Sequence, residues 1–162
     1  MGSSMILYKL TTANFKTRKG ESNETTWGEG VTHSGTGEGE LCGPGYIHAY
    51  TDPLLAVFLN PIHANIQNAV LWECEGDIAK SDNGLKVGCV SLTTLRRLEL
   101  PAVTTEQRIK FGLLCALEVY DNAAFAAWAR AWLSGEDRTE KPAAEAARAA
   151  ARAAAEIGRA HV

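Results

Sequence analysis

The sequence predicts an α+β fold, in which a small mixed or antiparallel sheet with one internal helix is followed by C-terminal helices. Three observations support this fold class. Segments of strand composition fill the first hundred residues, one short helical segment interrupts them, and helical periodicity takes over after residue 104. Strands and helices do not alternate as βαβ units, which argues against a doubly wound sheet.

The first expected strand is Ile6–Leu10, where apolar and polar residues alternate. A long Gly/Glu-rich loop is expected over 11–45, because eight of the 15 glycines fall between Gly20 and Gly45. Trp27 and Val31 indicate a short strand within this loop. Loops of this length in compact domains are usually functional, so the glycine-rich part is interpreted as a mobile lid.

A short strand is expected over Tyr46–Tyr50, after the turn signal Gly43–Gly45. Asp52 and Pro53 then have the residue types of a helix N-cap and first position. Asn60–Pro61 should end this helix, because the residue before proline avoids the helical conformation.

Three further strands are expected before the C-terminal helices: 69–75, 85–90 and 95–100. Gly76–Asp77 and Asp82–Gly84 are interpreted as turns around the link between the first two.

The C-terminal part is expected to be helical. Thr104 and Gln107 have the spacing of a capping box, and apolar residues recur at helical spacing up to Tyr120. A second helix is expected over 123–133 and a third, rich in Ala and Arg, over 143–157. The predicted organisation is a leader and initiator at 1–5, a single domain at 6–135 and a helical tail at 136–162. The tail is expected either as a solvated helix or as a helix–helix contact through which the chain could oligomerise.

Composition excludes several classes of protein. The 162 residues include 16 Lys and Arg against 19 Asp and Glu, so nucleic-acid coating is not expected. No apolar run is long enough for a membrane span. The four cysteines form no C-x-x-C pair and are read as free thiols of the cytoplasm. No metal or cofactor is expected.

The most distinctive candidate site follows the turn at Gly45. Alternation along a strand places Tyr46, His48 and Tyr50 on one face, where two aromatic rings and an imidazole could hold a planar ligand. The alternative is that the tyrosines are half-buried sheet residues and that His48 bonds a loop carbonyl. Both interpretations stay open at the level of sequence.

Two other groups of charged residues are candidates. Glu73 and Glu75 share a strand face, as an acid–base pair or as a solvated surface. Arg96 and Arg97 point to opposite faces, so at most one of them can grip a phosphate in a given site. The full predicted ligand-binding set is Lys9, Gly45, Tyr46, His48, Tyr50, Arg96 and Arg97.

Several segments resemble an uncharacterised family of bacteriophage and prophage proteins. They are the Leu7-Tyr8-Lys9 opening, the Cys42-x-x-Gly45-Tyr46-x-His48 motif, Leu71-Trp72-Glu73 and the Ala/Arg-rich tail. The core is more weakly similar to ADP-ribosyltransferase-like folds. That likeness implies that His48 helps to bind an NAD-derived ligand, and that Glu99, or else Glu75, is the catalytic glutamate of an enzyme.

The leading hypothesis is a phage accessory protein of the infected cell's cytoplasm that counters host defence. It would sequester a small nucleotide-type signal, such as an ADP-ribose derivative or a cyclic nucleotide. One alternative is an NAD-processing or ADP-ribosyltransferase-like enzyme. Another is an inhibitor that binds a host defence protein through the acidic run from Glu21 to Glu40.

Overall fold

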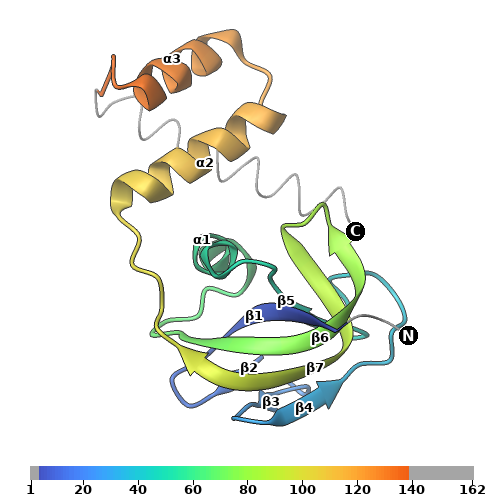
Figure 1. Cartoon of the computed structure of the whole chain (residues 1–162). Coiled ribbons are helices and arrows are strands. Elements are labelled where there is room, and N and C mark those ends of the chain that lie inside the picture. Colours follow the sequence, from blue (N-terminus) through green and yellow to red (C-terminus); the bar gives the residue numbers. More distant parts are fainter. Residues whose placement is uncertain (1–3, 139–162) are drawn as a thin grey trace. The chain divides into compact units, whose positions relative to one another are not determined.

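The computed structural model describes residues 4–138 (Figure 1). Contacts between residues divide the chain into two compact units, Met1–Pro101 and Ala102–Val162. The division therefore falls at Pro101, whereas a single domain over 6–135 was expected. The predicted tail, from residue 139 on, and the first three residues of the predicted leader lie outside the described residues.

The first unit is built on a five-stranded antiparallel sheet. Strands β1 (Met5–Thr11), β6 (Val70–Asp82), β7 (Lys86–Leu98) and β4 (Val31–Ser34) follow one another in that order. Strand β5 (Ile47–Ala49) pairs with β7 beside β4. Tyr8 and Tyr50 exchange two backbone hydrogen bonds of 2.8 Å, which join β1 to the end of β5. The sheet thus curls back on itself, and the α+β prediction is confirmed.

Strands β6 and β7 replace three expected strands with one long hairpin. Each has 13 residues, and Gly76–Asp77 lies within β6 rather than in a turn. A Cβ atom on Gly76 would lie 2.8 Å from both the Leu92 side chain and the Ser91 carbonyl oxygen. The pairing register shifts after Gly76, so this glycine marks a bulge that bends the strand. The turn at Asn83–Gly84 is confirmed, with positive φ at both residues and a hydrogen bond of 2.7 Å from the Leu85 amide to the Asp82 carbonyl.

The glycine-rich part of the expected loop lies along the sheet. We call residues 35–45 the glycine segment. Its Gly35 amide donates to the Val90 carbonyl and its Gly37 amide to the Gly45 carbonyl, both at 2.8 Å. The segment interpreted as a mobile lid is therefore bonded both to β7 and to itself. The preceding residues form a separate hairpin of β2 (Lys16–Thr17) and β3 (Thr25–Thr26).

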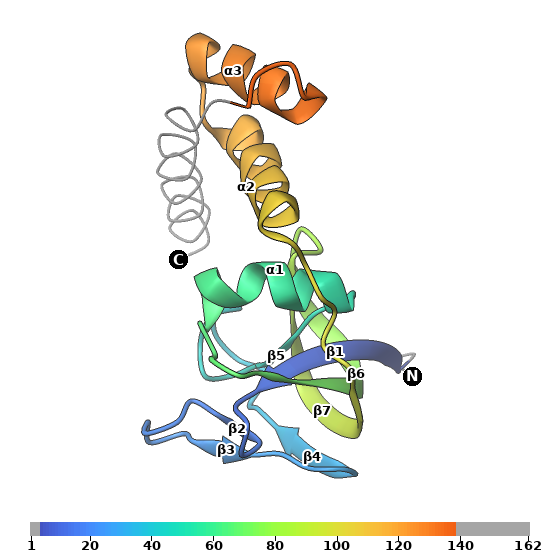
Figure 2. The same cartoon turned by 90° about the vertical axis from the view of Figure 1, so that its left-hand side faces the viewer.

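Helix α1 (Pro53–His63) lies across one side of the sheet, next to β1 (Figure 2). The Asp52 carboxylate accepts a hydrogen bond from the Leu54 amide at 2.7 Å, as expected of an N-cap. The helix continues two residues beyond Pro61, further than expected. A buried hydrophobic cluster of the first unit, to which α1 contributes no residue, contains Leu7, Trp27, Ala49, Trp72, Cys74, Val87, Cys89 and Leu92.

The second unit contains α2 (Thr105–Val119) and α3 (Ala123–Ser134). The capping box is present, because Thr104 and Gln107 bond each other's backbone amides at 3.1 and 2.8 Å. Gly135 ends α3 at φ 88°, and the two helices bury Leu113, Ala129 and Trp132. Within residues 4–138, no helix combines the length and apolar character needed to cross a bilayer.

Candidate functional site

A cavity of about 1370 Å³ opens in the first unit. Its walls come from β1, the β2–β3 hairpin, the glycine segment, β5, the first residue of β7 and the end of α1 with the loop after it. Among the side chains that line it are five cations and one carboxylate, Glu21. The cations are Lys9, Lys16, Arg18, Lys19 and Lys86. The cavity is therefore positive, although the whole chain has a net charge of -3.

Two of these lysines are buried in the sheet, and in the part of the chain that the structure describes their bonded partners are uncharged. We call Lys9 on β1 and Lys86 on β7 the cationic floor; they are 8% and 9% exposed. The Lys9 ammonium donates to the His48 carbonyl at 2.7 Å and lies 5.0 Å from the centre of the Trp27 ring. Lys86 donates to the Cys42 thiol at 3.1 Å. Neither forms an ion pair with any residue that the structure describes.

Burial of the Lys9 ammonium disfavours its charged form. Desolvation, with a smaller contribution from the charge of Arg18, lowers the pKa of Lys9 to about 8. The ammonium still holds its proton at neutral pH. Buried charges in proteins are normally paired, so an unpaired floor is the feature of this cavity that most needs an explanation.

His48 bonds a carbonyl of the glycine segment, one of the two arrangements that the sequence left open. Its Nε2 contacts the Leu41 carbonyl oxygen, which can only accept, so Nε2 carries the proton and Nδ1 is left as an acceptor. Burial, together with the charges of Lys86, Lys9 and Arg18, lowers the pKa of His48 to about 4. The imidazole is therefore neutral at physiological pH and also lines the cavity.

Tyr50 and His63 form a second pair in the cavity wall. The Tyr50 hydroxyl lies 2.7 Å from Nδ1 of His63, and the two rings stack with centroids 5.9 Å apart. Desolvation raises the pKa of Tyr50 and lowers that of His63 to about 4, so the tyrosine donates and Nε2 of His63 keeps its hydrogen. His63 was not among the predicted site residues. Its position at the end of α1, one helix after Tyr50, was the only available signal.

Tyr46 is held in place by its own hydrogen bond. Its hydroxyl donates to the Gly37 carbonyl at 2.6 Å, and the Lys80 ammonium lies 5.4 Å from its ring centre. Like Tyr50 it is buried yet contributes to the cavity wall. The predicted triad of Tyr46, His48 and Tyr50 therefore lines one cavity, with each polar group already bonded within the protein.

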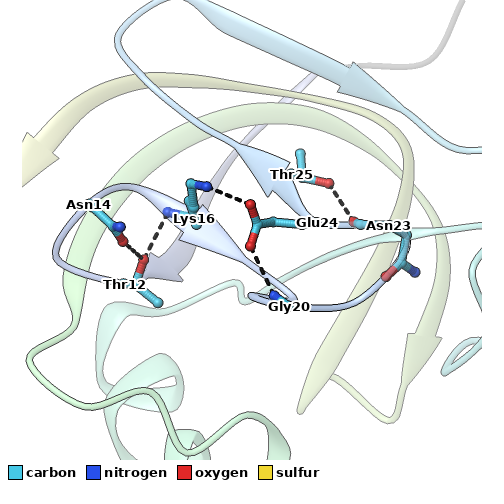
Figure 3. Close-up of polar contacts among 7 residues, drawn as sticks. All are labelled: Thr12, Asn14, Lys16, Gly20, Asn23, Glu24 and Thr25. Atoms are coloured by element: carbon cyan, nitrogen blue, oxygen red, sulfur yellow. Dashed lines mark hydrogen bonds and ion pairs between the residues drawn. The ribbon is translucent and has the colours of Figure 1, made fainter.

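The β2–β3 hairpin is organised by Glu24, as Figure 3 shows. Its carboxylate pairs with Lys16 and accepts from the Gly20 amide at 2.9 Å, while the Thr12 hydroxyl accepts from the Lys16 amide at 3.0 Å. The charge of Lys16 is therefore compensated by Glu24 within the hairpin. Arg18 and Lys19, in the connection between the two strands, form no ion pair with the described residues.

Several predicted site residues lie elsewhere. Arg96 grips Glu73 through two contacts of 3.0 Å, and Arg97 lies over Phe15 with its guanidinium carbon 5.4 Å from the ring centre. Neither arginine lines the cavity, and neither do Glu75 and Glu99, which are exposed.

Gly45 is also not part of the cavity lining. It belongs to the predicted ligand-binding set, but a Cβ atom there would lie 1.9 Å from the Glu38 carbonyl oxygen. The chain itself fills that space.

No family model, curated protein or solved structure matches the chain. Residues 4–138 contain no group of three or more His, Cys, Asp or Glu side chains arranged to hold a metal ion.

Proposed function

We propose that this protein binds a small nucleotide-type anion in the cavity of its first unit. The observation that supports this proposal best is the cationic floor, in which two lysines of the cavity wall are more than nine-tenths buried and donate to a carbonyl oxygen and a thiol. An anionic ligand would supply the missing counter-charge. Charge-assisted hydrogen bonds from lysine to phosphate are strong in such partly desolvated surroundings.

The remaining wall suits the uncharged part of a nucleotide. Trp27, Tyr46 and Tyr50 contribute aromatic surface, and His48 and His63 offer an acceptor and a donor for the edge of a base or a ribose hydroxyl. Ligand sites of this kind combine aromatic lining with a few placed polar groups. The polar atoms are fixed by internal hydrogen bonds, which limits the entropy lost on binding.

The geometry favours binding over catalysis. An ADP-ribosyltransferase-like mechanism needs a glutamate beside the ligand, but Glu75 and Glu99 are both exposed and outside the cavity lining. Glu73 is occupied by Arg96. Glu21 is the one carboxylate in the lining, and it lies in the β2–β3 hairpin connection. Sequestration of a ligand needs no such group, and it agrees with the proposed phage counter-defence role.

Isothermal titration calorimetry on the full chain tests this proposal. The ligand panel is AMP, NAD, ADP-ribose, cyclic ADP-ribose and cyclic dinucleotides. We expect at least one to bind, and Lys86→Met to weaken its affinity by about tenfold or more. Arg96→Met is the matched control, because it removes a cation of the same sheet outside the cavity. No heat with any of these ligands would refute the proposal.

Two further measurements separate the alternatives. Release of nicotinamide from NAD during incubation would indicate an enzyme instead of a binding protein. The protein-inhibitor alternative predicts a specific complex with a host protein that requires the exposed acids Glu29, Glu38 and Glu40 of the acidic run. Substituting these three by glutamine should leave nucleotide binding intact if the cavity is the functional site.

A further inference from the structure

We infer that the ligand carries at least two phosphate groups, one bound at the cationic floor and the second at Arg18 and Lys19 of the β2–β3 hairpin. This inference rests on the proposed function and makes it more specific. It predicts that ligands with two phosphates are preferred over otherwise similar ligands with one.

The first argument is that the unpaired cations of the cavity lie in two sets. Glu24 pairs with Lys16, which leaves the two floor lysines as one set and Arg18 with Lys19 as the other. Within the described residues none of these four cations forms an ion pair. Lysine and arginine bind phosphate groups through charge-assisted hydrogen bonds, so each set can hold one phosphate.

The second argument is that the two cation sets are joined by one aromatic ring. The Lys9 ammonium lies 5.0 Å from the centre of the Trp27 ring, and Nε1 of the same ring donates to the Thr17 hydroxyl at 2.9 Å. Thr17 is the neighbour of Arg18 in the chain. The floor and the hairpin cations thus belong to one continuous wall, and a single ligand can contact both.

The backbone also holds Arg18 in an unusual conformation. Its φ is 53°, a region that residues with long side chains rarely occupy, and its carbonyl accepts the Glu21 amide at 3.0 Å in the turn that follows. Glycine or asparagine is the common choice at such a position. An arginine there has a conformational cost, which a role for its guanidinium in ligand binding would explain.

The third argument is size. Pockets for a single drug-sized ligand have volumes of about 300–1000 Å³. The cavity, at about 1370 Å³, is larger than this range. It has room for a ligand that extends from the floor to the hairpin.

Calorimetric titration with AMP, ADP and cyclic di-AMP tests the inference on the full chain. We expect ADP, cyclic di-AMP or both to bind about tenfold more tightly than AMP. Arg18→Asn, which suits the positive φ, should remove this preference while changing the affinity for AMP less than about twofold. Lys86→Met should lower the affinity for all three ligands. Lys19→Gln provides a second hairpin variant at an exposed position, in case Arg18→Asn does not fold.

The outcomes distinguish the inference from the function on which it rests. A preference for ADP would indicate adjacent phosphates, and a preference for cyclic di-AMP would indicate separated ones; both support two phosphate sites. Equal affinities for all three ligands, or a loss of AMP binding in Arg18→Asn as large as the loss of ADP binding, would overturn the inference but leave the proposed function standing. Absence of binding by every ligand would instead refute both.

Discussion

Two groups of cations on the same sheet have opposite surroundings. Arg96 lies exposed on β7 and meets Glu73 of β6 in a two-contact ion pair, and each partner shifts the pKa of the other in the direction that favours the charged form. Lys9 and Lys86 lie buried in the cavity wall and contact a carbonyl oxygen and a thiol instead. The charges of the outer pair therefore compensate each other, whereas the two lysines of the cationic floor form no ion pair within residues 4–138.

This difference separates a structural role from a binding role. Exposed ion pairs add little to the stability of the folded protein, so the pair of Arg96 and Glu73 is interpreted as a feature of the sheet surface. A buried cation without a partner destabilises the protein while no ligand is bound. A bound anion would supply the counter-charge and remove this cost. The comparison predicts that perturbing the cavity wall changes stability, pH dependence and binding, while perturbing the outer pair changes them little.

Gly45→Ala should have the largest effect, because it disrupts the glycine segment that carries the partners of His48 and Lys86. The new methyl group would meet the Glu38 carbonyl oxygen at 1.9 Å, and a backbone atom cannot move aside as a flexible side chain can. We expect a loss of about 3 kcal/mol or more in the free energy of unfolding, measured by urea denaturation. Gly39→Ala is the control for space, because nothing lies within 4 Å of its added atom, although its φ, unlike that of Gly45, is positive. A loss in Gly45→Ala no larger than that in Gly39→Ala would show that contact with the Glu38 carbonyl oxygen does not set the cost.

His48→Gln should change the dependence of stability on acid. The pKa of His48 is 6.5 in the unfolded chain and about 4 in the folded one, so the unfolded state binds more protons between these values. Stability is therefore lost as the pH falls from 6.5 to 4, by about 3 kcal/mol from this group. The variant should lack that part of the loss. Denaturation at both pH values measures it, and subtraction of the two proteins removes the carboxylates that titrate in the same range.

A second pair of variants relates this result to the two groups of cations. Lys86→Met removes a positive charge that lowers the pKa of His48, so the acid-induced loss should shrink. Arg96→Met should leave it unchanged. If both variants behaved alike, the floor would have no special influence on His48, and the comparison would fail.

Local patterns predicted much of the fold. The capping box at Thr104, the Asp52 N-cap and the Asn83–Gly84 turn are short-range features that depend on a few neighbouring residues. The error at Gly76 has a different origin. A glycine between apolar residues looks the same in a turn and in a bulge, and only the approach of Leu92 from the partner strand decides between them.

The candidate site was predictable only in part for a related reason. Tyr46, His48 and Tyr50 are close in sequence, and alternation along a strand was enough to group them. Lys86 and Arg18 come from β7 and from the hairpin connection, and they reach the same cavity because the sheet curls through the contact between Tyr8 and Tyr50. Local sequence patterns do not predict that the sheet curls in this way and brings these residues together. Arg96 and Arg97 were chosen instead because arginine is the usual phosphate ligand.

The smallest effect that we predict is a loss of ligand affinity at alkaline pH, which we attribute to the deprotonation of Lys9. The folded pKa of Lys9 is about 8, so its ammonium is present at pH 7 and mostly lost at pH 9.5. The affinity for a phosphate ligand should fall by about tenfold over this interval, since one charge contact disappears. Lys9→Met should bind more weakly at pH 7 and show no such fall. An alkaline loss of the same size in Lys9→Met would assign the titration to another group and remove Lys9 from the site, whereas Arg96→Met should keep the wild-type pH profile because its guanidinium lies outside the cavity.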